Sequence, residues 1–357
     1  MKIQITKAGP DRLRPKPAGD KALGFGKIFS DHMFLMDYSE GTGWKNARIV
    51  PFGPLELPPT AVVFHYAQEI FEGLKAYYAK DGGICLFRPE RNAERMNRSA
   101  SRLCMPPVPV ENQIEAIETL VRLDREWIPR GNGASMYIRP AMIATESALG
   151  VHPSTEYLYF IVTGPVGAYY ARGFEPVNIL VEENYIRATR GGLGEAKTGA
   201  NYAASILAAR EAKAKGFDQV LWLDAERRRF VEEVGTMNIF FVFGGELVTP
   251  PLSGSILPGV TRDSVIELAR EWKIPVMERP VEIDEVIRRA EDGSLTEAFG
   301  SGTAAVISPV GAFSYRGREA RVGDGRVGKL SLRFYEGITG IQYGVVEDRH
   351  HWVHRVE

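Results

Sequence analysis

A lysine beside a glycine-rich segment is the first feature that could perform chemistry. Residues 191–198 read GGLGEAKT, which places Lys197 between Ala196 and Thr198. Small neighbours let a ligand approach the lysine closely, and a neutral lysine amine can bond covalently to a carbonyl compound. Desolvation or a nearby positive charge can supply the neutral form. A solvated surface lysine is the ordinary alternative.

The same segment is close to the nucleotide-binding pattern GxxxxGK[ST]. Residues 220–224, VLWLD, resemble an apolar strand that ends in a magnesium-binding aspartate. Ala196 stands where the pattern requires glycine, whose backbone freedom lets such a loop wrap a phosphate. Residues 185–190, YIRATR, are also polar for the buried strand that precedes such a loop. A P-loop-like NTPase therefore remains an alternative, which magnesium-dependent ATP hydrolysis would test.

Strands and helices in mixed order must position Lys197. Helical periodicity predicts helices at 91–103, 112–128, 202–215, 262–272, 283–290 and 329–341, and Thr261 can cap the helix at 262–272. Strands are expected at 61–66, 84–87, 135–143, 157–163, 177–181, 219–223, 238–243, 246–249, 295–299 and 304–307. This pattern predicts an α/β (α+β mixed) fold of two domains. We expect an N-terminal α/β domain at 1–163 with an irregular arm at 1–22, an interdomain loop at 164–175, and a C-terminal α/β domain at 176–357 that carries the lysine.

Composition excludes several classes of function. The 357 residues include 44 Lys and Arg and 45 Asp and Glu, for a net charge of -1, which argues against nucleic-acid and polybasic membrane binding. Two cysteines, Cys85 and Cys104, cannot build a disulfide framework or a cysteine-based zinc ribbon. No apolar run has the length of a membrane span. We expect a soluble cytoplasmic enzyme without a metal, in which His350, His351 and His354 belong to a frayed surface tail.

A set of longer segments carries a resemblance that no single motif would carry. In chain order they are FGKIFSDHM at 25–33, HYAQEIFEGLKAY at 65–77, LFRP at 86–89, RMNRSA at 95–100, YIRP at 137–140, KTGANYA at 197–203, EVGTMN at 233–238, LPGVTR at 257–262 and GTA at 302–304. Together they resemble the branched-chain amino acid aminotransferases, pyridoxal 5'-phosphate (PLP) enzymes of fold type IV. The resemblance implies two domains with PLP at their interface, assembled as a homodimer or a higher homo-oligomer.

The resemblance also implies the cofactor contacts. Lys197 would hold the aldehyde of PLP and move the catalytic proton, Tyr202 would face the phenolic oxygen, and Glu233 would face the pyridine nitrogen. A carboxylate there keeps the nitrogen protonated; the alternative for Glu233 is a surface acid beside Glu232. The remaining implied contacts are Arg88, Thr236, Leu257, Gly259, Val260, Thr261 and Thr303, in which the arginine fork and the amides of a helix start suit a phosphate.

The implied reaction moves the amino group of L-leucine, L-isoleucine or L-valine to 2-oxoglutarate, giving branched-chain 2-oxo acids and L-glutamate. By resemblance, Tyr66, Thr303 and Ala304 anchor the α-carboxylate, and Phe25, Tyr137 and Tyr169 line the side-chain pocket. Arg139 with Tyr137 could bind the second carboxylate of glutamate, although a structural ion pair would explain Arg139 equally well. A D-amino acid aminotransferase or an aminodeoxychorismate lyase of the same fold are the nearest alternatives. Ala305 and Ser308 replace the thiol pair of vertebrate members, so that redox switch is ruled out.

Overall fold

A computed structural model describes residues 1–17, 19, 23–131, 133–167 and 174–356. The chain forms two compact units, one of Met1–Ala171, Ala196–Gly199 and Gly340–Glu357, the other of Arg172–Glu195 and Ala200–Thr339. Both units combine helices with a sheet, which confirms the mixed α/β class. The units differ from the expected division at 196–199 and at 340–357. The expected division into domains at 1–163 and 176–357, joined by a loop at 164–175, stays a prediction.

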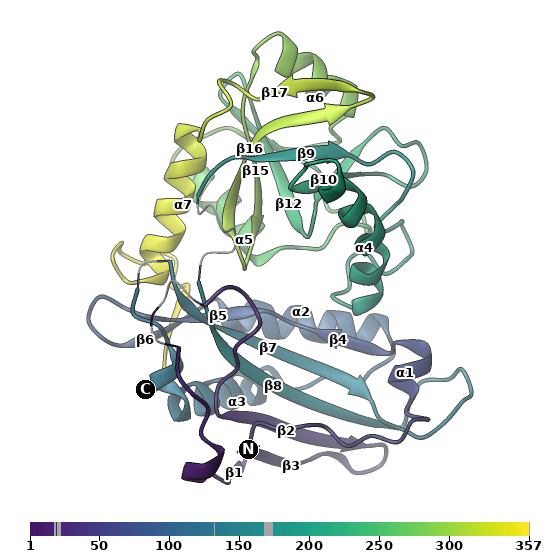
Figure 1. The fold of residues 1–357 in the computed structure, drawn as a ribbon, viewed down its shortest axis with the longest axis vertical. Coiled ribbons are helices and arrows are strands. Elements are labelled where there is room, and N and C mark those ends of the chain that lie inside the picture. Colours follow the sequence, from purple (N-terminus) through teal and green to yellow (C-terminus); the bar gives the residue numbers. More distant parts are fainter. Residues whose placement is uncertain (18, 20–22, 132, 168–173, 357) are drawn as a thin grey trace. The chain divides into compact units, whose positions relative to one another are not determined.

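A single large sheet organises the first unit. Its strands, in spatial order, are β1 (Gln4–Ile5), β3 (Gly43–Pro51), β2 (His32–Ser39), β8 (Glu156–Val166), β7 (Ser135–Ala144), β5 (Leu74–Tyr78), β6 (Ile84–Phe87) and β18 (Val353–Val356), with β4 (Glu69–Phe71) paired to β7. Two longer helices, α2 (Pro89–Arg102) and α3 (Val110–Leu123), lie against this sheet (Figure 1). The described residues of this unit also form the helical segments α1 (Val62–Tyr66), η1 (Pro10–Arg12) and η3 (Arg125–Trp127).

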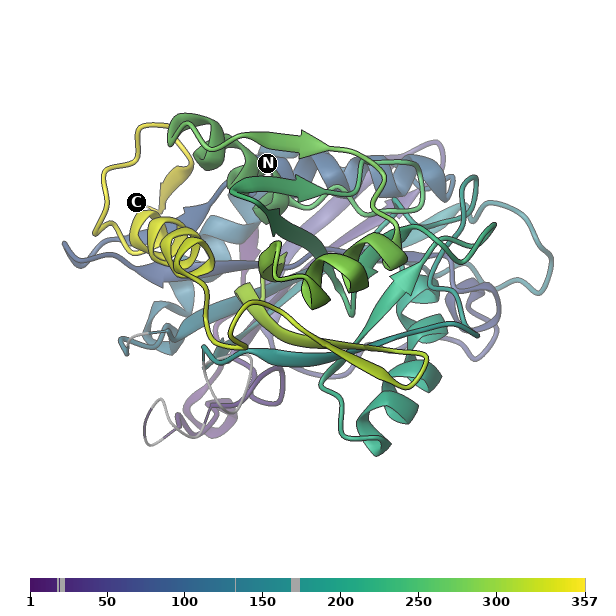
Figure 2. The same ribbon diagram turned by 90° about the horizontal axis from the view of Figure 1, so that it is seen from above.

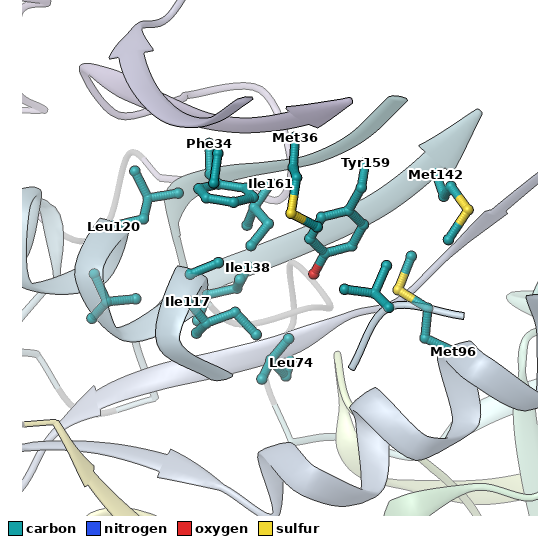
Figure 3. Packing of buried hydrophobic residues seen from close by; sticks show 14 of the residues in the cluster. Phe34, Met36, Leu74, Met96, Ile117, Leu120, Ile138, Met142, Tyr159 and Ile161 are labelled. Atoms are coloured by element: carbon teal, nitrogen blue, oxygen red, sulfur yellow. The ribbon is translucent and has the colours of Figure 1, made fainter. Parts of the chain in front are cut away.

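The core of the first unit lies between that sheet and the two helices. Phe34 and Met36 on β2 and Tyr159 on β8 point toward Ile117 of α3 and Met96 of α2 (Figure 3). All five side chains are buried. Because side chains alternate along a strand, residues between the core positions of β5 and β7 face the opposite side of the sheet. Ile138 is in the core, and its neighbours Tyr137 and Arg139 are partly exposed.

The second unit is built on a sheet that closes on itself. Its strands are β9 (Val177–Val181), β10 (Gln219–Leu223), β11 (Val231–Val234), β12 (Met237–Phe243), β13 (Glu246–Thr249), β14 (Val276–Glu278), β15 (Leu295–Gly302), β16 (Val306–Tyr315) and β17 (Arg318–Arg321). The order is β11-β10-β9-β16-β15-β12-β13-β14, with β17 on β16, and β11 pairs in addition with β12. This extra pairing closes a ring of strands, so the polar groups of those edges are satisfied within the unit.

Four helices accompany the closed sheet. They are α4 (Gly199–Ala214), α5 (Val260–Glu271), α6 (Ile283–Glu291) and α7 (Lys329–Gln342), the last drawn in yellow in Figures 1 and 2. The ring of Phe334 on α7 lies 5.0 Å from that of Trp272 and 5.7 Å from that of Phe299 on β15. These aromatic contacts attach α7 to β15 and to the end of α5.

Three expectations were wrong in detail. Residues 61–66 are a short helix rather than a strand, because the chain turns at Ala67, whose left-handed backbone donates to the Val63 carbonyl. Thr261 does not cap α5, since the helix starts at Val260 after Gly259 and leaves Thr261 in its first turn. The C-terminal segment is not frayed: β18 pairs with β6, and both ring nitrogens of His354 contact glutamates.

The described residues contain no helix long and apolar enough to cross a membrane.

Candidate active site

Two segments, β4 and α2, hold Lys197 and its neighbours in place. The N–H of Phe71, the last residue of β4, donates to the Lys197 carbonyl at 2.9 Å, and the N–H of Lys197 donates to Ser99 Oγ on α2 at 2.9 Å. The Glu69 carboxylate accepts from the N–H of Gly199 and from the Thr198 hydroxyl. The glycine-rich segment therefore reaches α4 through a run whose backbone groups are bonded to β4 and α2.

The amine of Lys197 lies against an aromatic ring in a low-dielectric environment. Its Nζ is 4.6 Å from the centre of the Phe71 ring. Burial lowers the pKa of Lys197 from its ordinary value of 10.5 to about 8, and the positive charges of Arg95 and Arg139 act in the same direction. Because an amine attacks a carbonyl carbon only in its neutral form, this environment prepares Lys197 for covalent chemistry.

A row of partly exposed side chains continues from Phe71 across the face of the sheet. The Arg139 guanidinium lies 4.5 Å from the centre of the Phe71 ring, and its Nη2 donates to the Tyr137 hydroxyl at 3.0 Å. Phe25 packs edge-on against Tyr137 with ring centres 5.0 Å apart. The row thus combines two aromatic rings, a phenol and a guanidinium, which suits a ligand with an apolar side chain and a carboxylate.

Arg88 occupies a special backbone position at the start of α2. Its φ of 50° is left-handed, Pro89 follows as the first helical residue, and its N–H donates to the Trp352 carbonyl at 2.7 Å. Its guanidinium lies 4.8 Å from the Trp352 ring, and the side chain is only 5% exposed. A non-glycine residue in this region is uncommon and is often associated with a functional site.

In the second unit, Glu233 is the centre of a buried polar network. It is 3% exposed, its Oε2 lies 2.8 Å from Arg187 Nε, and its Oε1 accepts from the Leu257 N–H at 2.9 Å. Asn238 donates to Glu233 at 3.4 Å and to the Leu257 carbonyl at 2.9 Å. Glu233 is therefore not a surface acid, and Arg187 is a partner that the sequence analysis did not identify.

Strand register brings the other expected residues of this unit to one end of the closed sheet. Glu233 pairs with Asn238, and Asn238 pairs with Ser301 on β15. Thr236 is exposed in the turn from β11 to β12, and Thr303 and Ala304 lie in the turn from β15 to β16. The bonds of Leu257 to Glu233 and Asn238 place the start of α5 at the same end.

The start of α5 suits an anion. Gly259 is its N-cap and makes no side-chain cap, while Val260 and Thr261 form its first turn. A Cβ at Gly259 would lie 2.1 Å from the Asn238 side-chain oxygen, so only glycine fits this close approach. Exposed amides at a helix N-terminus favour a phosphate. Tyr202, partly exposed in the first turns of α4, is a phenol of the same unit.

These residue types fit PLP. In the first unit, Lys197 offers an amine with a lowered pKa for the aldehyde, and Arg88 offers a guanidinium that suits a phosphate. In the second unit, the uncapped start of α5 offers amides that suit a phosphate, and Glu233 offers a buried carboxylate. Within the described residues no cluster of His, Cys, Asp and Glu could hold a metal ion.

A nucleotide loop does not fit the same segment. β9 ends at Val181, so no strand leads directly into Gly191. A Cβ at Gly194 would lie 2.2 Å from the Ser255 carbonyl oxygen, so this glycine serves close backbone packing.

One expected substrate residue, Tyr66, makes no described contact with these groups. The Tyr66 hydroxyl donates to the Leu149 carbonyl, and the described contacts of Tyr66 include none with Lys197, Tyr137 or Arg139. Tyr169 lies outside the described residues. Sequence analysis gave no role to Phe71, Ser99, Glu72 or Arg95, although all four lie inside the segments of the resemblance. Phe71 and Ser99 are distinguished by their hydrogen bonds to Lys197, and Glu72 and Arg95 by the charges that act on it.

Comparison with known proteins identifies one family. Residues 69–313 match the model of amino-transferase class IV. The branched-chain-amino-acid transaminase 1 of Bacillus subtilis is 54% identical over 340 residues, which covers 95% of each chain. The branched-chain-amino-acid aminotransferase of Mycobacterium tuberculosis is 49% identical over 338 residues, which covers 93% of this chain and 92% of that one.

Solved structures show the same architecture. The branched-chain amino acid aminotransferase of Escherichia coli aligns with a TM-score of 0.77 and 28% identity over 91% of this chain and 99% of that one. The branched-chain amino acid aminotransferase of Thermobaculum terrenum, in its PLP form, aligns with a TM-score of 0.74 and 27% identity over 91% of this chain and 98% of that one. Both confirm the expected fold class.

Proposed function

The chain belongs to the class IV amino-transferases, and from that premise we propose that it is a branched-chain amino acid aminotransferase that uses PLP. It transfers the amino group of L-leucine, L-isoleucine or L-valine to 2-oxoglutarate. The observation that carries this proposal is Lys197, whose amine has a lowered pKa and whose backbone is bonded on both sides. The names of the similar proteins favour this reaction over that of a D-amino acid aminotransferase or a lyase.

The residues divide the work of the reaction between them. Bound PLP supplies an aldehyde for the amino group and a ring that withdraws electrons from the substrate Cα. Lys197 would hold the cofactor through its aldehyde, since at pH 7 a pKa of about 8 leaves roughly a tenth of the amine neutral, and its amine would serve as the proton carrier of the site. Glu233, held by Arg187 and the Leu257 N–H, keeps negative charge at the pyridine nitrogen.

Binding and orientation are assigned to the remaining residues. Arg88, Thr236, Gly259, Val260, Thr261 and Thr303 hold the phosphate, and Tyr202 donates to the phenolic oxygen. Arg139, whose guanidinium is fixed by Tyr137 and Phe71, receives the second carboxylate of glutamate. Phe25 and Tyr137 contact the apolar side chain of leucine, and Thr303 and Ala304 anchor the α-carboxylate.

Visible absorption of the full chain with PLP tests the proposal. A yellow band that bleaches with L-leucine and returns with 2-oxoglutarate is the expected result, because each substrate completes one half of the reaction. A yellow band that does not change with L-leucine but bleaches with a D-amino acid would contradict the proposed substrates and favour a D-amino acid aminotransferase. The absence of any band after incubation with PLP would contradict the cofactor.

We also propose a homodimer in the cytoplasm. Four side chains around one loop expose apolar surface: Phe64 and Leu149 at 61%, Val151 at 85% and Tyr66 at 40%. The Tyr66–Leu149 hydrogen bond ties α1 to this loop, and a second copy covering the patch would remove it from water. Cys85 and Cys104 are both free thiols, as suits a reducing compartment. Sedimentation should give a dimer for the natural chain and a weakened one for Val151→Glu.

A further inference from the structure

A buried ion pair that the reaction does not use lies at the end of β4. Arg95 Nε and Nη2 donate to the two carboxylate oxygens of Glu72 at 2.7 and 2.8 Å. Asn92 donates to the same carboxylate at 2.9 Å, and the Gly73 N–H donates at 3.2 Å. Glu72 is 1% exposed and Arg95 is 4% exposed. Such a bidentate pair has little freedom to change its geometry.

The two members of this pair belong to the segments that hold Lys197. Glu72 directly follows Phe71, whose N–H donates to the Lys197 carbonyl. Arg95 precedes Ser99 by one helical turn on α2, and Ser99 Oγ accepts from the Lys197 N–H. Any shift of the ion pair would therefore move both backbone anchors of the lysine.

The charges of the pair act on Lys197 in opposite directions. The guanidinium of Arg95 lowers the pKa of Lys197 and the carboxylate of Glu72 raises it, while Arg139 lowers it and Tyr137 raises it from β7. Burial raises the pKa of Glu72, but the charge and hydrogen bonds of Arg95, together with the Lys197 charge and the Asn92 hydrogen bond, lower that pKa below its ordinary value. Glu72 is thus ionised at neutral pH, and its charge is matched by Arg95 at hydrogen-bond distance.

We propose that Glu72 and Arg95 are positioning residues for Lys197, whose paired charges cancel so that the desolvated amine is available in its neutral form. The use of that amine rests on the proposed function, whereas the pairing itself does not. Without Arg95 the Glu72 carboxylate would favour the ammonium form. Without Glu72, the unpaired charge of the Arg95 guanidinium would disfavour the ammonium form of Lys197.

The test is the pH dependence of Lys197 labelling in the purified full chain before PLP is added. Fluorodinitrobenzene reacts with neutral amines, and mass spectrometry of the Lys197 peptide gives the labelling midpoint. Glu72→Gln should lower the midpoint and Arg95→Gln should raise it, each by about one pH unit. The double variant Glu72→Gln/Arg95→Gln should return it close to that of the natural chain. Lys213, exposed on α4, is the internal reference in the same digest.

Two outcomes would overturn the proposal: midpoints that do not move in folded variants, or single variants that shift the midpoint in the same direction. A loosened structure would expose Lys197 and raise the midpoint in every variant, so opposite shifts report charge. Arg95→Lys keeps the charge without the fork and should leave the midpoint near that of the natural chain. If Arg95→Gln does not fold, the labelling midpoints of Glu72→Gln and of the double variant still test the proposal. Because no cofactor or substrate is present, the result is independent of the transaminase assay.

Discussion

Phe71 contacts Lys197 with both its backbone and its side chain. The Phe71 N–H donates to the Lys197 carbonyl at 2.9 Å, and the Phe71 ring centre lies 4.6 Å from Lys197 Nζ. The same ring lies 4.5 Å from the Arg139 guanidinium. One aromatic side chain therefore contacts both the proposed catalytic amine and the proposed carboxylate anchor.

Replacing Phe71 with leucine should slow the reaction while the chain stays folded. Leucine keeps the backbone bond to Lys197 but removes the ring that contacts the Arg139 guanidinium, a cation–π contact that contributes about 1 kcal/mol, so kcat/KM for L-leucine should fall roughly fivefold. Steady-state kinetics measure the effect, and Phe71→Tyr, which retains the ring, is the matched control. An unchanged kcat/KM in Phe71→Leu would show that the ring contacts do not matter.

Gly73 makes room for the Tyr137 hydroxyl. A Cβ at Gly73 would lie 2.1 Å from that oxygen, and Tyr137 is also held by Arg139 and Phe25. Gly73→Ala should displace the phenol and raise KM for 2-oxoglutarate about tenfold, more than KM for the branched-chain substrate. Combining Gly73→Ala with Tyr137→Phe should relieve part of the clash, so additive effects of the two changes would argue against this contact.

Lys197 should cost the cofactor-free chain stability. A pKa lowered from 10.5 to about 8 means that the unfolded chain binds the proton more tightly, at a cost of about 3 kcal/mol below pH 8. As pH rises from 8 to 10.5, this cost disappears. Lys197→Met should therefore abolish turnover, stabilise the chain toward urea at pH 7, and lose that advantage near pH 10.5. If Lys197→Met and the natural chain were equally stable toward urea at both pH values, burial of Lys197 would not cost stability.

Neighbouring glutamates on β11 offer a matched pair of variants. Glu233→Gln keeps an acceptor for the Leu257 N–H but removes the charge paired with Arg187, so PLP should still bind while turnover falls roughly 10²-fold. Burial raises the pKa of Glu232, which accepts from the Ser255 hydroxyl and has no role in the proposed reaction, so Glu232→Gln should leave turnover unchanged. Equal rates for the two variants would remove the role proposed for Glu233.

Tyr159 carries a hydroxyl that the fold does not satisfy. This β8 residue is fully buried, and its oxygen has no hydrogen-bond partner among the described residues. Tyr159→Phe should therefore raise the free energy of unfolding by about 1 kcal/mol. The Tyr157 hydroxyl accepts from Gln68 at 3.2 Å and donates to the Cys104 carbonyl at 3.3 Å. Tyr157→Phe should therefore lower the free energy of unfolding. Urea unfolding of both variants checks the opposite signs.

Local pattern was sufficient for most elements of the second unit. The strands at 177–181, 219–223 and 246–249 and the helix at 329–341 agree with β9, β10, β13 and α7 within one residue. Apolar runs of strand length and helical spacing are local properties, so they can be recognised without knowing what lies opposite. Residues 61–66 show the limit: they have strand composition, yet they make only one isolated bridge, Ala61 with Ser147, and turn into a helix.

The sequence by itself determined the family, the residue types of the cofactor site and Lys197 as its amine, because long motifs in fixed order leave little room for coincidence. Only the tertiary structure decided which charges act on that amine. Phe71 and Lys197 are far apart in the chain, and Glu72 and Arg95 pair across 23 positions. Nothing local in the sequence says that a glutamate before a glycine will meet an arginine on a helix, since that contact is set by how β4 and α2 pack. Burial, which lowers the pKa of Lys197 most, is likewise a property of the folded chain.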